Sequence, residues 1–170
     1  PVFYELGVQP NFQSNPLNLS DVEIIKAAQD SEYLDGIAYS SSNVVSLSAK
    51  LNYSPRLFAG RKTRFNLQLN HHYYHDIPER SYQSYSLGVR QSLGKYRYLN
   101  LGYWILPEYY LRNYRYQDIS TLRTSREICK FGTDRFWLGY KHRITKRNTI
   151  EYRLTLRNEI YQAPFSHYDM

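Results

Sequence analysis

The stretch from Phe136 to Tyr161 constrains the fold most, because it has the pattern of one long β-hairpin. Almost every second residue of each arm is apolar or aromatic, and most residues between them are polar or charged. Successive strand side chains point to opposite faces, so each arm has one apolar face and one charged face. The connection at 145–148 is polar and short, as a tight hairpin requires. Arms of this length are unusual in soluble domains and suit strands that cross a bilayer.

The same alternation recurs along the chain, which predicts strands that follow one another in a meander without helical crossovers. Pro10 is expected to end the first strand, and Pro107 to produce a bulge in the fifth. Gly94 and Lys95 predict a tight reversal. The predicted strands cover residues 2–8, 44–54, 64–73, 84–90, 99–111, 136–144 and 150–160.

One helix is expected in the long segment at 10–43. Ser20 and Glu23 have the spacing of a capping box and precede a short apolar run, which predicts a helix from Asp21 to Gln29. The segment is acidic, and it is the candidate for a plug or a partner contact; the alternative is a solvated surface loop. A polar loop is expected at 113–131. Compact basic connections at 55–61, 94–96 and 145–148 alternate along the chain with those at 10–43, 75–81 and 113–131.

The composition indicates one folded domain, residues 1–170, rich in tyrosine. The chain has 19 Tyr but only 7 Phe and 2 Trp, and tyrosine favours strands and membrane–water interfaces. No run approaches the ~20 apolar residues of a transmembrane helix. The start at Pro1, without an initiator Met or a signal-peptide pattern, favours a processed form or a fragment of a larger barrel. Cys129 is the single cysteine, so an internal disulfide framework is excluded.

Together, the alternating segments, the asymmetric connections and the tyrosine content resemble those of bacterial outer-membrane β-barrel proteins. The resemblance is one of general pattern and selects no particular family. It implies an all-β, antiparallel, up-and-down transmembrane barrel, or a contiguous part of one, with about 7–8 strands and one short helix in a long loop. It also implies the outer membrane of a Gram-negative-type bacterium and contact with the lipid bilayer. The end at 163–170 departs from the pattern, because such barrels often finish on a strand with a terminal aromatic residue.

In such a barrel the charged faces would line the lumen, and tyrosines of the apolar faces would form an aromatic girdle against lipid. An excess of cations in the lumen would favour anions in a passive pore. The alternative is a structural scaffold whose interior is filled, with Arg–Glu pairs formed across strands by Glu151, Arg153 and Arg157. The predicted lumen residues are Lys50, Arg64, Arg90, Lys141, Arg143, Glu151, Arg153, Arg157 and Glu159. The predicted girdle residues are Tyr53, Tyr73, Tyr85, Tyr103, Tyr140 and Tyr152.

The main competing hypothesis is a soluble β-barrel or sandwich, since a soluble antiparallel sheet also alternates apolar and polar residues. Residues 44–170 carry 21 Lys and Arg against 9 Asp and Glu, a net +12, so such a module would bind nucleic acid or another polyanion. No nucleic-acid signature supports this, and the basic residues are spread over every strand and turn. Other subunits, or a protein in the lumen or on the loops, are further partners that this class of protein allows.

The sequence gives little support for catalysis, a cofactor or a metal site. It lacks the Gly-x-Ser-x-Gly, His-Glu-x-x-His and phosphate-loop motifs. His71 and His75 fall on one strand face about 13 Å apart, and His72 points to the opposite face, whereas zinc ligands must converge on one ion. We therefore expect a protein that is not an enzyme.

Overall fold

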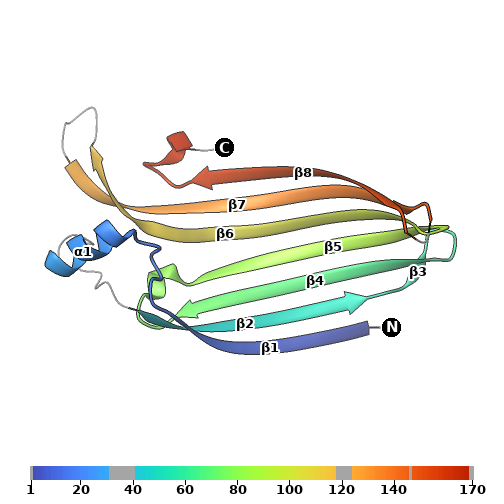
Figure 1. The fold of residues 1–170 in the computed structure, drawn as a ribbon, viewed down its shortest axis with the longest axis horizontal. Coiled ribbons are helices and arrows are strands. Elements are labelled where there is room, and N and C mark those ends of the chain that lie inside the picture. The colour runs from blue at the N-terminus through green and yellow to red at the C-terminus, as the bar shows by residue number, and fades with distance from the viewer. Residues whose placement is uncertain (1, 31–40, 118–123, 146, 169–170) are drawn as a thin grey trace.

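The chain forms a single antiparallel sheet in a computed structural model that describes residues 2–30, 41–117, 124–145 and 147–168. Sheet neighbours follow the order of the chain, β1-β2-β4-β5-β6-β7-β8, and β3 pairs with the start of β4 (Figure 1). This confirms the predicted antiparallel meander. The strands are β1 (Val2–Gln13), β2 (Ser42–Tyr53), β3 (Arg56–Leu57), β4 (Arg61–Tyr74), β5 (Tyr82–Gly94), β6 (Arg97–Gln117), β7 (Thr124–Arg143) and β8 (Thr149–Tyr161).

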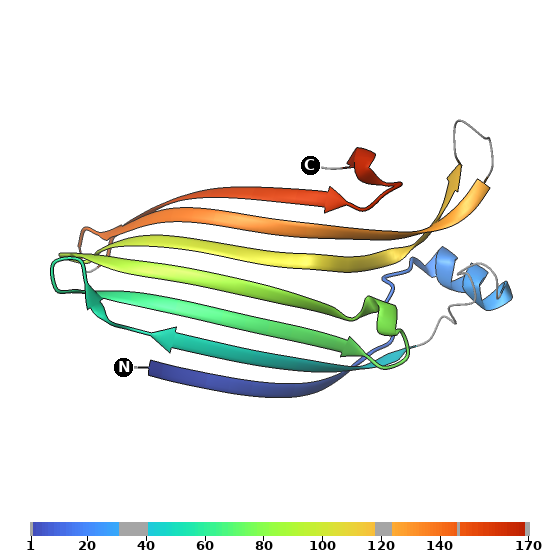
Figure 2. The same ribbon diagram turned by 180° about the vertical axis from the view of Figure 1, so that it is seen from behind.

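The sheet is open, so these residues do not form the closed barrel that the sequence pattern led us to expect. Strands β1 and β8 lie at opposite edges of the sheet (Figures 1 and 2). In the described part of the chain no backbone pairing joins these two edges, because each strand of the path pairs with its neighbours in the chain. What is confirmed is the antiparallel sheet itself and the length of the seven strands along its path, from 12 residues in β1 to 21 in β6; β3 has only two residues.

The register gathers most of the apolar side chains of the strands on one face of the sheet. In its middle row Leu87 of β5 pairs with Leu67 of β4 and with Tyr103 of β6. Among the described residues, no second layer of strands or helices covers this face (Figures 1 and 2). As a result Leu87 is 46% exposed in the middle of the sheet, and Leu6 of the edge strand β1 is 77% exposed. The row continues through Tyr4, Leu51, Leu67, Leu87, Tyr103, Phe136 and Leu156.

The helix α1 (Asp21–Gln29) begins and ends where the sequence predicts it. The backbone N–H of Glu23 donates to Ser20 Oγ over 3.4 Å, and the backbone N–H of Ser20 donates to Glu23 Oε2 over 2.9 Å. This reciprocal capping box satisfies two amides that the helix start would leave unpaired. The helix lies at the end of the sheet towards which β6 runs (Figure 1). Across the described ranges, no helix has the length and hydropathy needed to span a membrane.

A small apolar core forms at the same end of the sheet as α1. Leu17 and Leu19, from the segment between β1 and α1, pack with Ile77 and Tyr110, and Ile24 of α1 packs against them. This core joins the β1–α1 segment and the β4–β5 connection to β6. It is therefore the anchor of the acidic segment on the sheet.

Arg80 is the most buried charged residue of this end, with only 3% of its surface exposed. It ends the 3-10 helix η1 (Pro78–Arg80). Its Nη1 donates to the carbonyls of Tyr110 and Leu111 over 3.0 and 3.1 Å, and its Nη2 donates to the Tyr109 hydroxyl over 2.7 Å. The guanidinium carbon also lies 5.0 Å from the centre of the Tyr109 ring. Arg80 thereby ties the β4–β5 connection to β6.

Two boundary predictions are wrong. Strand β1 continues through Pro10 to Gln13, because a proline is tolerated on an edge strand where its missing N–H can face away from the neighbour. The expected loop at 113–131 is mostly strand, since β6 extends to Gln117 and β7 begins at Thr124. The connection at 118–123 lies outside the described residues. The predicted difference in connection length between the two ends of the sheet therefore comes mainly from the long segment at 14–41 and from the projecting β6–β7 hairpin.

The predicted bulge at Pro107 is confirmed. The register of β6 against β7 shifts between Leu106 and Tyr109, and again between Tyr110 and Arg112. The tight reversal at Gly94 and Lys95 is also present, and both residues have positive φ angles, of 82° and 47°. Glycine adopts this conformation without steric cost, which explains its place at this turn.

Candidate functional site: the polar face of the sheet

The predicted lumen residues lie on the face opposite the apolar one. Their positions alternate with the apolar rows, as the registers of the strands show. Arg143 shares this face but lies at the end of β7, where its guanidinium carbon is 5.7 Å from the centre of the Tyr96 ring. The polar face carries the cations Lys50, Arg64, Arg90, Arg135, Lys141, Arg153 and Arg157 and the carboxylates Glu5, Glu151 and Glu159.

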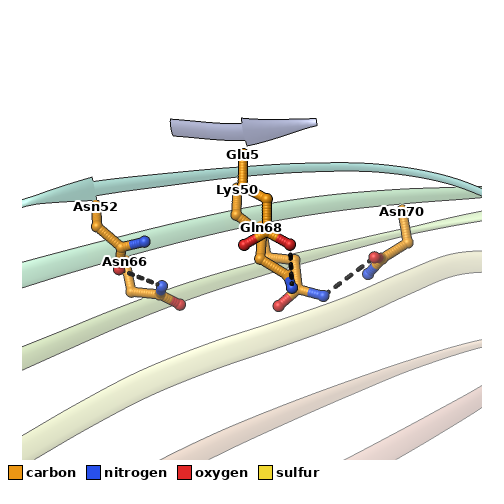
Figure 3. Close-up of polar contacts among 6 residues, drawn as sticks. All are labelled: Glu5, Lys50, Asn52, Asn66, Gln68 and Asn70. Carbon is orange, nitrogen blue, oxygen red and sulfur yellow. Dashed lines mark hydrogen bonds and ion pairs between the residues drawn. The ribbon is translucent and has the colours of Figure 1, made fainter. Parts of the chain in front are cut away.

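Towards β1, the polar face is a network of neutral amides with one ion pair (Figure 3). Asn66 Nδ2 donates to Asn52 Oδ1 over 2.8 Å across β4 and β2. Lys50 Nζ lies 3.4 Å from Glu5 Oε1, so the cation of β2 is balanced by the edge strand β1. Both partners are partly exposed, and such surface pairs contribute at most about 1 kcal/mol.

On β8 the carboxylates pair along the strand as well as across it. Glu151 lies 3.3 Å from Lys141 of β7 and 3.3 Å from Arg153. Arg157 pairs with Glu159. The expected cross-strand pairing is thus found for Glu151, which pairs with Lys141 of β7, whereas Arg153 and Arg157 pair with carboxylates of their own strand.

Three arginines of the polar face have no carboxylate partner among the described residues: Arg64, Arg90 and Arg135. Arg90 Nε donates to Asn100 Oδ1 over 2.7 Å, a neutral acceptor that leaves its charge uncompensated. The Arg135 guanidinium carbon lies 5.8 Å from the centre of the Trp104 ring, at the outer limit of a cation–π contact. The uncompensated positive charge of the polar face therefore comes from β4, β5 and β7. Arg135 and the two tryptophans were not singled out from the sequence.

A trough of small and neutral side chains crosses the sheet between two cationic rows. We name it by its residues, which pair in register from β2 to β8: Asn52, Asn66, Gly88, Gly102, Trp137 and Thr155. On one side lies the Arg64 row, which consists of Arg64, Arg90, Asn100, Gly139 and Arg153. On the other side lies the Lys50 row, which consists of Lys50, Gln68, Ser86, Trp104, Arg135 and Arg157. Each row is two residues along the strands from the trough, or about 7 Å.

Trp137 lies flat on the floor of the trough because Gly102, its partner in the register, has no side chain. A Cβ atom at residue 102 would lie 2.0 Å from Trp137 Cζ2 and 2.2 Å from Cε2. The benzene ring of the indole therefore occupies the space directly above the glycine. On its other side Trp137 pairs with the small Thr155. One face of the indole ring is held against the sheet.

Two adjoining hollows open along the trough and share Trp137 and Arg153. The first has a volume of about 420 Å³ and is lined by Ser86, Trp104, Arg135, Trp137, Arg153 and Thr155. The second has a volume of about 310 Å³, and its lining includes Arg64, Arg90 and Asn100. Aromatic rings, amides, hydroxyls and guanidinium groups thus line one continuous depression, and the ion pair of Lys141 and Glu151 also lines the second hollow. This chemistry suits a ligand that has flat apolar surfaces, hydroxyl groups and negative charge.

The predicted girdle tyrosines all lie on the apolar face. Tyr73 and Tyr53 are near opposite ends of their strands, whereas Tyr103 lies in the middle row beside Leu87. Tyr103 also donates from its hydroxyl to Asp134 Oδ2 over 3.1 Å. The set is therefore distributed along the strands: Tyr85 lies in a row between those of Tyr73 and Tyr103, whereas Tyr140 and Tyr152 pair in a row beyond that of Tyr53.

The histidines of β4 do not converge. His72 lies on the polar face, where its Nδ1 is 2.9 Å from Ser46 Oγ and its ring stacks on Tyr82 with centres 4.6 Å apart. His71 belongs to the other face, where it pairs with Leu47. Over the described ranges, no group of three His, Cys, Asp or Glu side chains is placed to hold a metal ion.

Comparison with known proteins adds no relative to this picture. No protein-family model matches the chain, and neither the curated proteins nor the solved structures include a significant match.

Proposed function

We propose that this sheet is part of the wall of a transmembrane β-barrel in the outer membrane of a Gram-negative-type bacterium. The apolar face would contact lipid, and the polar face would line an aqueous lumen. The protein would act as a passive pore or as a structural scaffold.

The uncovered apolar face supports this proposal most. A soluble domain buries the apolar face of a sheet against a second layer, and soluble monomers rarely expose apolar patches beyond a few hundred Å². Here the apolar rows run across every strand from β1 to β8 without such a layer among the described residues. Lipid chains are the solvent in which a face of this kind is stable.

The height of the apolar face agrees with a bilayer. In β2 the apolar positions run from Val45 to Tyr53, which is about 26 Å at the usual rise of a strand. The lipid-facing band of an outer-membrane barrel is about 25 Å tall, and its strands cross at a tilt. At a tilt of about 40° the apolar run of β2 spans about 20 Å of this height, and the whole 12-residue strand spans about 30 Å.

The charge of the polar face supports a lumen that favours anions. Arg64, Arg90 and Arg135 lack carboxylate partners in the part of the chain that the structure describes, and rings of charge set the selectivity of pores. We expect anion-selective currents in planar bilayers, and we expect Arg90→Glu to shift the reversal potential towards cations. Arg143→Glu, at the end of β7, makes the same change of charge outside the trough and should shift it less. Cation selectivity of the unmodified protein would contradict this part of the proposal.

Labelling of neighbouring residues on opposite faces tests the membrane orientation. In a Cys129→Ala background, Leu87→Cys and Ser86→Cys each place one thiol on β5, the first on the apolar face and the second on the polar face. Each thiol is labelled with an environment-sensitive fluorophore in protein reconstituted into vesicles. Brominated acyl chains should quench the label at residue 87 at least about threefold more than the label at 86, because bromine quenches only on contact within the hydrocarbon.

A second pair on β4, Leu69→Cys and Asn70→Cys, guards against a local effect at β5. Aqueous iodide should quench the label at residue 86 more than the label at 87, and the label at residue 70 more than the label at 69. Equal quenching of the two positions by brominated lipid, or a protein that stays dispersed without detergent, would overturn the proposal.

A further inference from the structure

We infer that the trough is a binding site for an acidic polysaccharide whose flat sugar rings lie across the strands. The inference uses the polar face alone, and therefore stands or falls separately from the membrane orientation of the apolar face.

The floor of the trough is built for a flat ring. Trp137 lies against Gly102, so one face of its indole is held by the sheet while the side chain lines both hollows. Gly88 continues the floor beside it, where the nearest atom to an added Cβ would be 3.8 Å away. A sugar ring has an apolar face of C–H groups, and such a face stacks on an aromatic ring. The hollows of about 420 and 310 Å³ each fit a sugar residue or two.

The sides of the trough are built for negative charge. Arg64 and Arg90 lie in one flanking row and Arg135 in the other, and none of them has a carboxylate partner among the described residues. Guanidinium groups bind carboxylates through two parallel hydrogen bonds. The side-chain amides of Asn52, Asn66 and Asn100 and the hydroxyls of Ser86 and Thr155 add hydrogen-bonding groups suited to sugar hydroxyls.

The two-sided arrangement of the cations favours a polysaccharide over a nucleic acid. In a ribbon-like chain of uronic acids, successive rings turn over and present their carboxylates to alternate edges. The two flanking rows lie about 7 Å on either side of the trough, so both edges of such a ribbon would meet arginines. A single nucleic-acid strand has its phosphates along one edge, and sequence-tolerant binding of its bases requires several stacking platforms in succession. Here Arg135 already covers Trp104, which leaves Trp137 as the platform of the trough.

Tryptophan fluorescence measures this binding directly, because Trp104 and Trp137 are the only tryptophans and both line the first hollow. The full chain in zwitterionic detergent, at low salt, is titrated with a hexamer of β-1,4-linked glucuronic acid, which forms such a ribbon. A neutral β-linked hexamer of glucose and an oligothymidylate of similar length are titrated in parallel. We expect a saturable change of emission with the acidic hexamer, weakened by added salt, and at least about tenfold weaker binding of the neutral hexamer.

Substitutions of single arginines separate the trough from general positive charge. Arg90→Gln and Arg135→Gln remove one cation from each flanking row, and each should weaken binding of the acidic hexamer about fivefold or more. Arg143→Gln removes the same charge at the end of β7 and should leave binding within twofold of the unmodified protein. Far-UV circular dichroism of each variant shows that the sheet is retained.

Three outcomes would overturn the inference. They are equal binding of the acidic and neutral hexamers, an equal loss of binding in Arg143→Gln and Arg90→Gln, and tighter binding of oligothymidylate than of the acidic hexamer. The two proposals can fail separately. If brominated lipid quenched both positions equally but the acidic hexamer bound selectively, the binding site would be supported and the membrane proposal would be rejected.

Discussion

Replacing Arg80 with methionine is expected to lower the free energy of unfolding by about 3 kcal/mol, the largest effect that we predict for a single substitution. Hydrogen bonds from a charged donor contribute about 1.5–3 kcal/mol each, and buried acceptors that lose a donor add their desolvation cost. Arg80 serves two backbone carbonyls of β6 and the Tyr109 hydroxyl at once. Methionine fills similar volume but supplies no donor. Urea unfolding in detergent, followed by circular dichroism, measures the change.

Two further variants show whether the guanidinium itself matters. Arg80→Lys keeps the charge but cannot reach three acceptors with a planar fork, so it should recover only part of the loss. Arg64→Met removes an exposed arginine of the polar face and should change stability by no more than about 0.5 kcal/mol. If Arg80→Met and Arg64→Met were equally mild, the buried contacts of Arg80 would not be stabilising.

Replacing Gly102 with alanine is expected to destabilise the protein by about 2 kcal/mol and to move the Trp137 ring. The added methyl group would lie 2.0 Å from Trp137 Cζ2, a distance that no pair of carbon atoms tolerates. Either the indole leaves the floor of the trough or the β6–β7 pairing gives way, and overpacking of this kind costs about 1–3 kcal/mol. In a Trp104→Phe background, Trp137 is the only emitter. A displaced indole gains water contact, so its emission should shift to longer wavelength.

Gly88 provides a matched control, because it is the register partner of Gly102 on β5. A Cβ at residue 88 would meet its nearest atom at 3.8 Å, which is ordinary van der Waals contact. Alanine should therefore fit, and the protein should gain up to about 1 kcal/mol from the lost flexibility of glycine in a strand. If alanine lowers the free energy of unfolding at residue 102 and raises it at residue 88, the contact with Trp137, and not strand propensity, decides the result. A change of the same sign in the free energy of unfolding at both positions would contradict this account of the trough.

Much of the fold follows from local patterns that the sequence displays openly. Alternation in the β7–β8 segment predicts both strands and their faces, since one side of the sheet is mostly apolar. Ser20 and Glu23 predict the helix start because a capping box needs only residues three apart. Pro107 predicts a break in the ladder because proline lacks an N–H group.

The misplaced loop at 113–131 has a physical cause. Strand β6 pairs with β5 only as far as Ile105, and β7 pairs with β8 only from Phe131 onwards, so the outer part of the β6–β7 hairpin is a two-stranded ribbon (Figure 1). A ribbon of two strands has no sheet on either side to distinguish an apolar face from a polar one. Nothing then imposes alternation on its sequence, and it resembles a polar loop.

The trough was beyond prediction from sequence for a different reason. Trp137 meets Gly102 only through the register of β6 against β7, and that register depends on bulges whose size no local pattern gives. Arg80 also carries no local signal, because a single arginine in a turn is ordinarily solvated. Its partners on β6 lie 29 to 31 residues further along the chain.

The direction of the two edge strands limits how the sheet can be completed. Every neighbouring pair along the path from β1 to β8 is antiparallel, so the six successive reversals leave β1 and β8 pointing the same way. A ring in which these two strands met directly would contain one parallel seam. A ring that is antiparallel throughout needs an odd number of additional strands between them. The parity of the path therefore dictates that any partner completing an antiparallel cylinder contributes strands in odd number.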